Sequence, residues 1–217
     1  MARGQHRRPL AGLGLFILIG VLAGCAGLPK PEISAALRDQ YHVAEVVVDT
    51  PENAELWWGD AERELAAKDG VAFNDSGDGK AISQEEFAAL PKTRAYVGKK
   101  IAGIVRDGVK AKVDGALHGA KAANLKLQVR KLFIASAAQR VIVGGVHQLI
   151  VDAWLADAAT GQELTPRQMF SVAVGGGGGV VGVLTDQVIN SMMNDPVYRL
   201  ADQVGLKTRA WLVPNAT

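Results

Sequence analysis

The sequence predicts an α+β fold in two layers, with a mainly antiparallel sheet of about four strands and two long helices packed on one face of it. Two observations predict this fold class. Apolar residues recur at steps of three and four over 93–117 and again beyond 180, which is the period of amphipathic helices. Between these segments, apolar and polar residues alternate over 124–130 and 146–157, as in strands with one face in water.

The first expected strand is Tyr41–Asp49, which is rich in valine and ends at Thr50-Pro51. Thr50 as N-cap, Pro51 at the first helical position and acids in the first turn predict a helix through Lys68, closed by Gly70. Its apolar stripe includes Ala54, Trp57 or Trp58, Ala61 and Leu65.

Trp57 and Trp58 lie about 100 degrees apart on such a helix. We expect both to pack in the core, and an exposed tryptophan here would indicate a contact with a partner, because tryptophan is favoured at interfaces.

The segment Asn74–Glu86 resembles a calcium-binding EF-hand loop, with Gly79 sixth and Glu85 twelfth when counted from Asn74. Ser76 replaces the usual acid at position three, and the pattern is out of register by one residue, since counting from Asp75 restores Ile82 and Glu86 but loses the glycine at position six. The alternative is a solvated turn followed by a helix that Ser83 caps with Glu86 as its reciprocal partner. We assign no metal or other cofactor on this basis.

The longest helix is expected over Thr93–Leu117, where cationic residues fall mostly off the apolar stripe. The stripe consists of Val97, Ile101, Ile104, Val105, Val109, Val113, Ala116 and Leu117.

Three strands follow, at Asn124–Arg130, at Val146–Asp157 and at about Glu163–Val174. A turn at Asp157–Gly161 joins the last two, and Pro166 should lie at a strand start or a sheet edge. After the glycines at 175–179, a helix is expected over 181–192, and Asp195-Pro196 restarts it through Trp211.

No motif for catalysis is present. The glycine run lacks the Gly-Lys-Ser/Thr of a phosphate-binding loop, so a tight strand-to-helix connection is the better interpretation. His42, His118 and His147 lie on separate elements without the spacing of metal ligands, and Gly-x-Ser-x-Gly is absent.

The amino terminus has the pattern of an export signal. Arg3, Arg7 and Arg8 precede the apolar run 10–22, which is short for a membrane-spanning helix. Leu22-Ala23-Gly24-Cys25 follows and contains the only cysteine of the chain.

This segment resembles the lipobox of bacterial lipoproteins. The resemblance implies cleavage before Cys25, diacylation of its thiol and acylation of the new amino terminus. The several chains would hold the protein firmly on a membrane. Ala26, where an aspartate usually retains lipoproteins in the inner membrane of Gram-negative bacteria, implies an outer-membrane address facing the periplasm. In a Gram-positive host, the same anchor would lie outside the only membrane.

Removal of residues 1–24 leaves 21 basic and 22 acidic residues, so the mature chain has no basic excess to indicate nucleic-acid binding. With its thiol used for lipid the chain has no disulfide, and stability must come from a packed core. We therefore expect a signal peptide at 1–24, a lipidated tether at 25–33 and one periplasmic α+β domain at 34–217.

The order of elements, with Asp-Ala-Ala-Thr-Gly after a strand and a glycine run before the last helix, is similar to that of several envelope lipoproteins. These are the curli-secretion lipoprotein and the auxiliary lipoproteins of ABC transporters. The resemblance implies support of assembly or transport in the envelope.

We therefore expect a membrane-anchored, non-enzymatic binding or assembly module with an envelope protein as partner. One alternative is a carrier of lipid or a small ligand, in which the long helix over the sheet forms an apolar cleft, and a deep pocket lined by Ile, Val and Met would favour it. Another is an envelope hydrolase built from dispersed acids and His147, which convergent acids in a cleft would favour. An exposed apolar patch would favour the assembly role.

Overall fold

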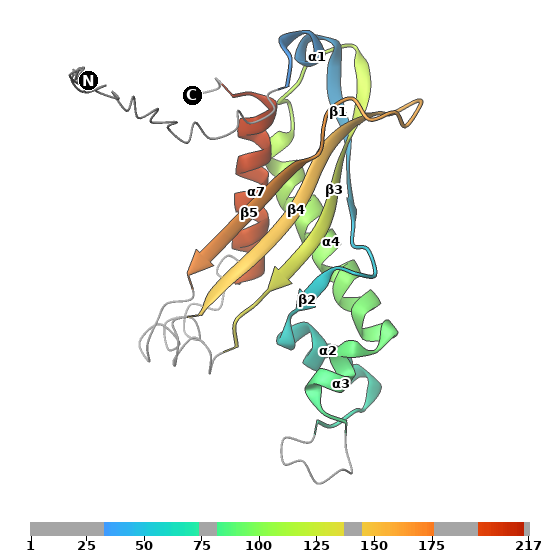
Figure 1. The fold of residues 1–217 in the computed structure, drawn as a ribbon, viewed down its shortest axis with the longest axis vertical. Helices are drawn as coiled ribbons and strands as arrows, with labels where there is room; N and C mark the ends of the chain where they lie inside the picture. Colours follow the sequence, from blue (N-terminus) through green and yellow to red (C-terminus); the bar gives the residue numbers. More distant parts are fainter. Residues whose placement is uncertain (1–32, 74–81, 137–144, 176–194, 215–217) are drawn as a thin grey trace, which may run out of the picture. The chain divides into compact units, whose positions relative to one another are not determined.

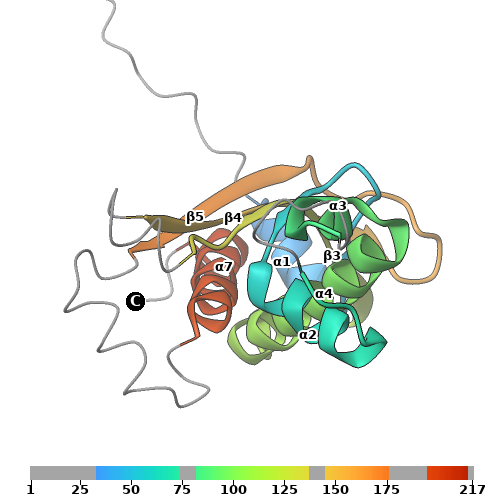
Figure 2. The ribbon, with the colours of Figure 1, turned by 90° about the horizontal axis from the view of Figure 1, so that it is seen from below.

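The computed structural model describes residues 33–73, 82–136, 145–175 and 195–214, all of which belong to one compact unit, Pro31–Thr217. This unit has two layers, a sheet and a layer of helices in which α4 (Pro91–Val113) and α7 (Pro196–Leu212) cover the same sheet face (Figures 1 and 2). The predicted two-layer α+β class is confirmed. None of the helices described combines the length and apolar character that crossing a bilayer requires.

The sheet is mixed, whereas the sequence predicted a mainly antiparallel one. Its order is β1 (Tyr41–Asp49), β3 (Lys121–Phe133), β4 (Val146–Asp157) and β5 (Gln168–Gly175), and the short β2 (Glu55–Trp57) also pairs with β3. β1 and β2 run parallel to β3, while β4 runs antiparallel to both β3 and β5. The parallel pairs arise because helices connect β2 to β3, and a crossover of that kind brings the chain back to its starting end.

Alternation along β3 is as predicted. Leu125, Leu127 and Val129 are at most 1% exposed on the face toward the helices, which we call the inner face. Lys126 and Gln128 lie on the opposite, outer face. The period of two is therefore enough to orient this strand.

The predicted helix from Thr50 through Lys68 is wrong in its first half. The amide of Ala54 donates to Pro51 O at 2.9 Å in a turn, β2 follows, and α2 begins only at Gly59 (Gly59–Asp69). β2 pairs with Lys131–Phe133, so hydrogen bonds of the sheet override the local helix signals. The predicted end is correct, with Gly70 in the left-handed region at φ 68°.

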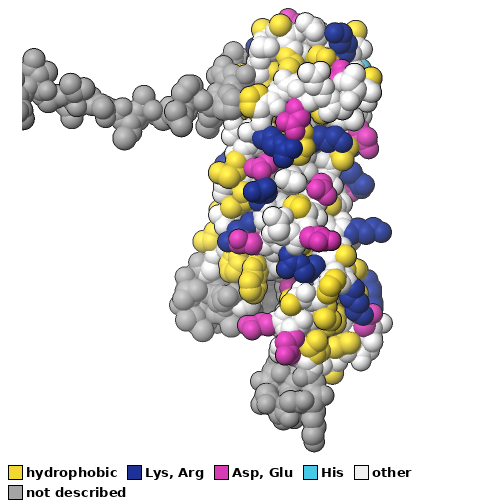
Figure 3. All heavy atoms as spheres, turned by 45° about the vertical axis from the view of Figure 1, so that its right-hand side comes forward, with side chains coloured by type: hydrophobic (Ala, Val, Ile, Leu, Met, Phe, Trp, Pro, Cys, Tyr) yellow, Lys and Arg dark blue, Asp and Glu magenta, His cyan; other side chains and the backbone are white. Residues whose placement is uncertain are grey.

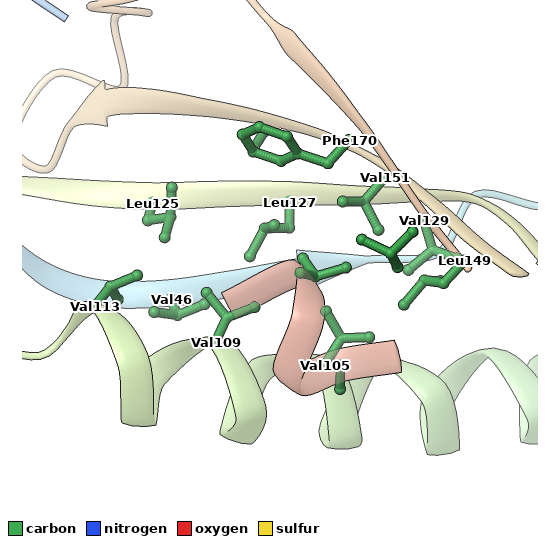
Figure 4. Packing of buried hydrophobic residues seen from close by; sticks show 14 of the residues in the cluster. Val46, Val105, Val109, Val113, Leu125, Leu127, Val129, Leu149, Val151 and Phe170 are labelled. Atoms are coloured by element: carbon green, nitrogen blue, oxygen red, sulfur yellow. The ribbon is translucent and has the colours of Figure 1, made fainter. Parts of the chain in front are cut away.

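Helix α4 supplies the central apolar stripe of the core. Val97, Ile101, Val105, Val109 and Val113 are at most 2% exposed, and the last three point toward the sheet in Figure 4. The helix ends at Val113 rather than Leu117, although Ala116 and Leu117 remain buried beyond its end.

Helix α7 begins at Pro196, where the Asp195 side chain accepts from the amide of Val197 at 2.9 Å. It approaches α4 closely, since a Cβ on Gly108 would lie 3.0 Å from that of Ala201. The predicted helix over 181–192 lies outside the described residues.

Short elements complete the fold, namely α1 (Ala35–Gln40) and α3 (Gln84–Ala89). The predicted turn at Asp157–Gly161 is present. The Asp157 carboxylate accepts from the amides of Ala159 and Thr160, and the hydrogen bond from the Thr160 amide lowers its pKa. Pro166 precedes the edge strand β5, as expected.

Candidate functional site

Two features singled out in the sequence lie outside the described residues. They are Cys25 with the segment before it, and the glycines at 176–179. Their proposed roles stay predictions.

The capping interpretation of Glu86 is confirmed. Its Oε2 accepts from the amide and the hydroxyl of Ser83, both at 2.9 Å, and Ser83 Oγ accepts from the amide of Glu86. The hydrogen bond from the Ser83 amide lowers the pKa of Glu86. Residues 74–81 of the calcium-like loop lie outside the described part, so calcium binding stays a prediction.

His42 on β1 and His147 on β4 each contact a backbone group. His42 Nδ1 is 2.9 Å from the carbonyl oxygen of Gly119, and the buried His147 accepts at Nδ1 from the amide of Ala135 at 3.1 Å. Within the described ranges there is no group of three His, Cys, Asp or Glu residues that could hold a metal ion. This arrangement gives the hydrolase alternative no support.

A groove of about 950 Å³ runs along α4 from Pro91 to Arg106, beside the turn that joins β1 to β2. Its lining is mostly apolar and small, and comprises Val48, Thr50, Pro51, Leu56, Pro91, Ala95, Gly98, Ala102 and Gly103. Thr50 fixes the turn to the helix by donating from its hydroxyl to Gly98 O at 3.2 Å. A Cβ on Gly103 would have no other atom within 4 Å, so the groove is open there.

Among the charged side chains that line the same groove, cations outnumber acids. They are three cations, Arg94, Lys99 and Arg106, and one acid, Glu52. Arg94 donates to the carbonyl oxygens of Glu52 and Ala54, and Arg106 pairs with Asp107 at 2.9 Å. Among the described residues, Lys99 has no ion-pair partner. The groove therefore combines an apolar floor with a cationic rim.

The second candidate surface lies on the outer face of the sheet, which no described helix covers (Figures 1 and 2). There an apolar band crosses the strands, defined by Trp57, Phe133, Val146, Ile150 and Met169. Trp57 pairs directly with Phe133, while Val146 and Ile150 lie diagonally across from it on β4.

Three large apolar side chains of the apolar band are more exposed than large apolar residues usually are. Trp57 is 55% exposed, Val146 49% and Met169 61%. The expectation that both tryptophans lie in the core is therefore wrong for Trp57 and correct for Trp58, which is 4% exposed. On the side of the molecule that Figure 3 draws, positive and negative side chains are interspersed.

A charged cluster fastens α2 to α4. Glu64 accepts hydrogen bonds from Lys100, Lys68 and Tyr96. The bond from Lys100 contributes most to lowering the pKa of Glu64 to about 2, followed by those from Lys68 and Tyr96. Because Glu64 lies on α2 while Tyr96 and Lys100 lie on α4, we interpret this cluster as structural.

Comparison with known proteins gives a match to a family described as of unknown function, DUF6778, over residues 97–202. No curated protein matches. Among solved structures, the chain is similar to a protein of Xanthomonas campestris from the family DUF330, with 15% identity and a TM-score of 0.38, covering 85% of this chain and 88% of that one.

Two further similar structures are described as lipoproteins. One is a candidate lipoprotein from Caulobacter crescentus, with 19% identity and a TM-score of 0.28 over 52% of this chain and 83% of that one. The other is lipoprotein GNA1162 from Neisseria meningitidis, with 16% identity and a TM-score of 0.24 over 72% of this chain and 99% of that one.

Sequence reasoning gave an apolar cleft along the long helix only as part of the carrier alternative, and it did not identify the residues that line the groove. The sequence does indicate one wall of the groove, because the small residues Ala95, Gly98, Ala102 and Gly103 share one face of α4 at helical spacing. What could not be read from the sequence is that the β1–β2 turn forms the opposite wall.

Proposed function

We propose that the chain is a lipoprotein of the cell envelope, anchored through Cys25 in the outer membrane, and that its folded domain is a non-enzymatic binding module for an envelope protein complex. The apolar band is the surface that docks the partner.

The observation that carries this proposal is the exposure of Trp57 beside Phe133 on a sheet face that none of the described helices covers. Large apolar side chains that cluster on the surface mark interaction sites more often than isolated ones do. Tryptophan and methionine are enriched at protein interfaces, and the apolar band contains both.

Anchoring is supported by the sequence of residues 1–25, with its basic start, apolar run and single cysteine. A lipid anchor confines the domain to the membrane surface, which raises its effective concentration near a membrane-bound partner. Docking through a modest patch is then sufficient for a stable complex.

The experiment places a photoreactive residue at Met169 in the full chain and irradiates intact cells. The matched control is the same residue at Leu206, an apolar side chain on α7 that is 44% exposed. We expect position 169 to crosslink one envelope protein that position 206 does not crosslink. We also expect the complex with that protein, extracted in detergent and run on native gels, to be lost in the Trp57→Ser variant.

Three results would contradict the proposal. They are crosslinks from both positions alike, crosslinks only between copies of this chain, and a complex that Trp57→Ser leaves unchanged while Leu206→Ser dissolves it.

A further inference from the structure

We propose that the groove along α4 binds an anionic membrane lipid, with an acyl chain on the small-residue floor and the headgroup at the cationic rim. This site is distinct from the apolar band.

The dimensions of the groove fit an extended chain. Its helix wall runs from Pro91 to Arg106, which corresponds to about 22 Å at the α-helical rise. Its volume of about 950 Å³ lies at the upper end of the range for ligand sites. The side chains on this part of the helix are small, so a narrow apolar chain can lie close to the helix backbone. They belong to Ala95, Ala102 and Gly103.

The charged side chains of the groove favour an anionic ligand. Arg94, Lys99 and Arg106 outnumber the single acid Glu52 at the lining. A negatively charged headgroup would find in Lys99 a cation that no described residue pairs with. The two arginines add positive charge to the rim while keeping their own contacts, Arg94 with the carbonyl oxygens of Glu52 and Ala54 and Arg106 with Asp107.

The backbone of the opposite wall disfavours an extended peptide strand as occupant. A bound peptide strand needs free amides and carbonyls along the groove. Here Arg94 donates to the carbonyls of Glu52 and Ala54, the Ala54 amide donates to Pro51 O, and proline has no amide to offer. An acyl chain requires no hydrogen bonds, so it suits this wall.

The test uses the full, acylated chain in phosphatidylcholine vesicles that contain traces of diazirine-labelled phosphatidylglycerol or diazirine-labelled phosphatidylcholine. After irradiation, labelled peptides are mapped by mass spectrometry. We expect the anionic probe to label residues 91–106 about fivefold more than the zwitterionic probe, which is the upper range for one exposed charge pair.

Two variants remove the site in different ways. Gly103→Phe fills the groove where no atom lies within 4 Å, and should abolish labelling of 91–106. Lys99→Glu changes only an exposed side chain and should lower anionic labelling to the zwitterionic level. Arg199→Glu, an exposed cation on α7, is the matched control and should change nothing.

Equal labelling by the two probes, or labelling of 91–106 that persists in both Gly103→Phe and Lys99→Glu, would overturn the proposal. So would capture of a polypeptide instead of lipid by a photoreactive residue at Ala95 in intact cells. None of these results affects crosslinking from Met169, so failure of the lipid site and failure of the docking proposal are distinguishable.

Discussion

Trp57 and Trp58 are adjacent in the chain but lie in opposite environments, with exposed fractions of 55% and 4%. Trp57 is the last residue of β2 and faces away from the helices, whereas Trp58 precedes α2 and packs in the core. Lys100 Nζ lies 5.1 Å from the ring centroid of Trp58. One tryptophan therefore serves stability, and the other is available to a partner.

This division predicts opposite effects of two identical substitutions. Trp58→Ala should lower the free energy of unfolding by about 3–5 kcal/mol, as expected for a large buried aromatic side chain. Trp57→Ala should change it by less than about 1 kcal/mol, in the range of surface substitutions. Urea denaturation followed by circular dichroism measures both, and equal losses would show that Trp57 is buried.

Gly119 is predicted to tolerate no side chain. A Cβ there would lie 2.0 Å from the carbonyl carbon of Gln40 and 2.1 Å from the amide nitrogen of Tyr41, so the backbone would have to move. The Gly119 amide also donates to Tyr41 O at 3.0 Å. Gly119→Ala should destabilise the fold by at least about 1–3 kcal/mol, the usual cost of overpacking.

The matched control for this substitution is Gly103→Ala. That Cβ meets nothing within 4 Å inside a helix, so alanine should be neutral or stabilising by up to about 1 kcal/mol. If thermal unfolding showed Gly119→Ala to be as stable as Gly103→Ala, the backbone of Gly119 would not lie as close to Gln40 and Tyr41 as the structure shows.

The cluster around Glu64 predicts a loss of stability in acid. Its pKa falls from an ordinary 4.5 to about 2, chiefly through the hydrogen bond from Lys100. Since the folded pKa is lower than the unfolded one, the contribution is complete above pH 4.5 and is lost as pH falls toward 2. The cluster is partly exposed, so we expect no more than about 1 kcal/mol.

Glu64→Gln provides the comparison. Thermal melts between pH 2 and 6 should show the parent protein more stable than the variant near pH 6, with the difference vanishing toward pH 2. A difference that stays constant over this range would mean that ionisation of Glu64 does not stabilise the fold.

Periodic patterns in the sequence predicted much of the fold. The stripe that includes Ile101 and Val105 identified α4, and the alternation around Leu127 assigned the buried face of β3, because each segment is long enough for its period to be unambiguous. The Ser83–Glu86 capping box was readable because it is local.

The errors occurred where distant contacts override local signals. Thr50-Pro51 looks like a helix start, but pairing of Glu55–Trp57 with β3 takes that segment into the sheet. The parallel orientation of β1 and β3 follows from the helices between them, a connection that the sequence already indicated. The groove needed two segments that lie about 40 residues apart, so no single pattern could predict it.

Mass spectrometry of the mature protein is the decisive measurement, since the proposed role depends on a domain held at the membrane by lipid. We expect a chain that begins at Cys25 and carries three acyl chains, and a Cys25→Ser variant that leaves the membrane fraction. An unmodified thiol at Cys25, or a serine variant that fractionates like the parent, would contradict it.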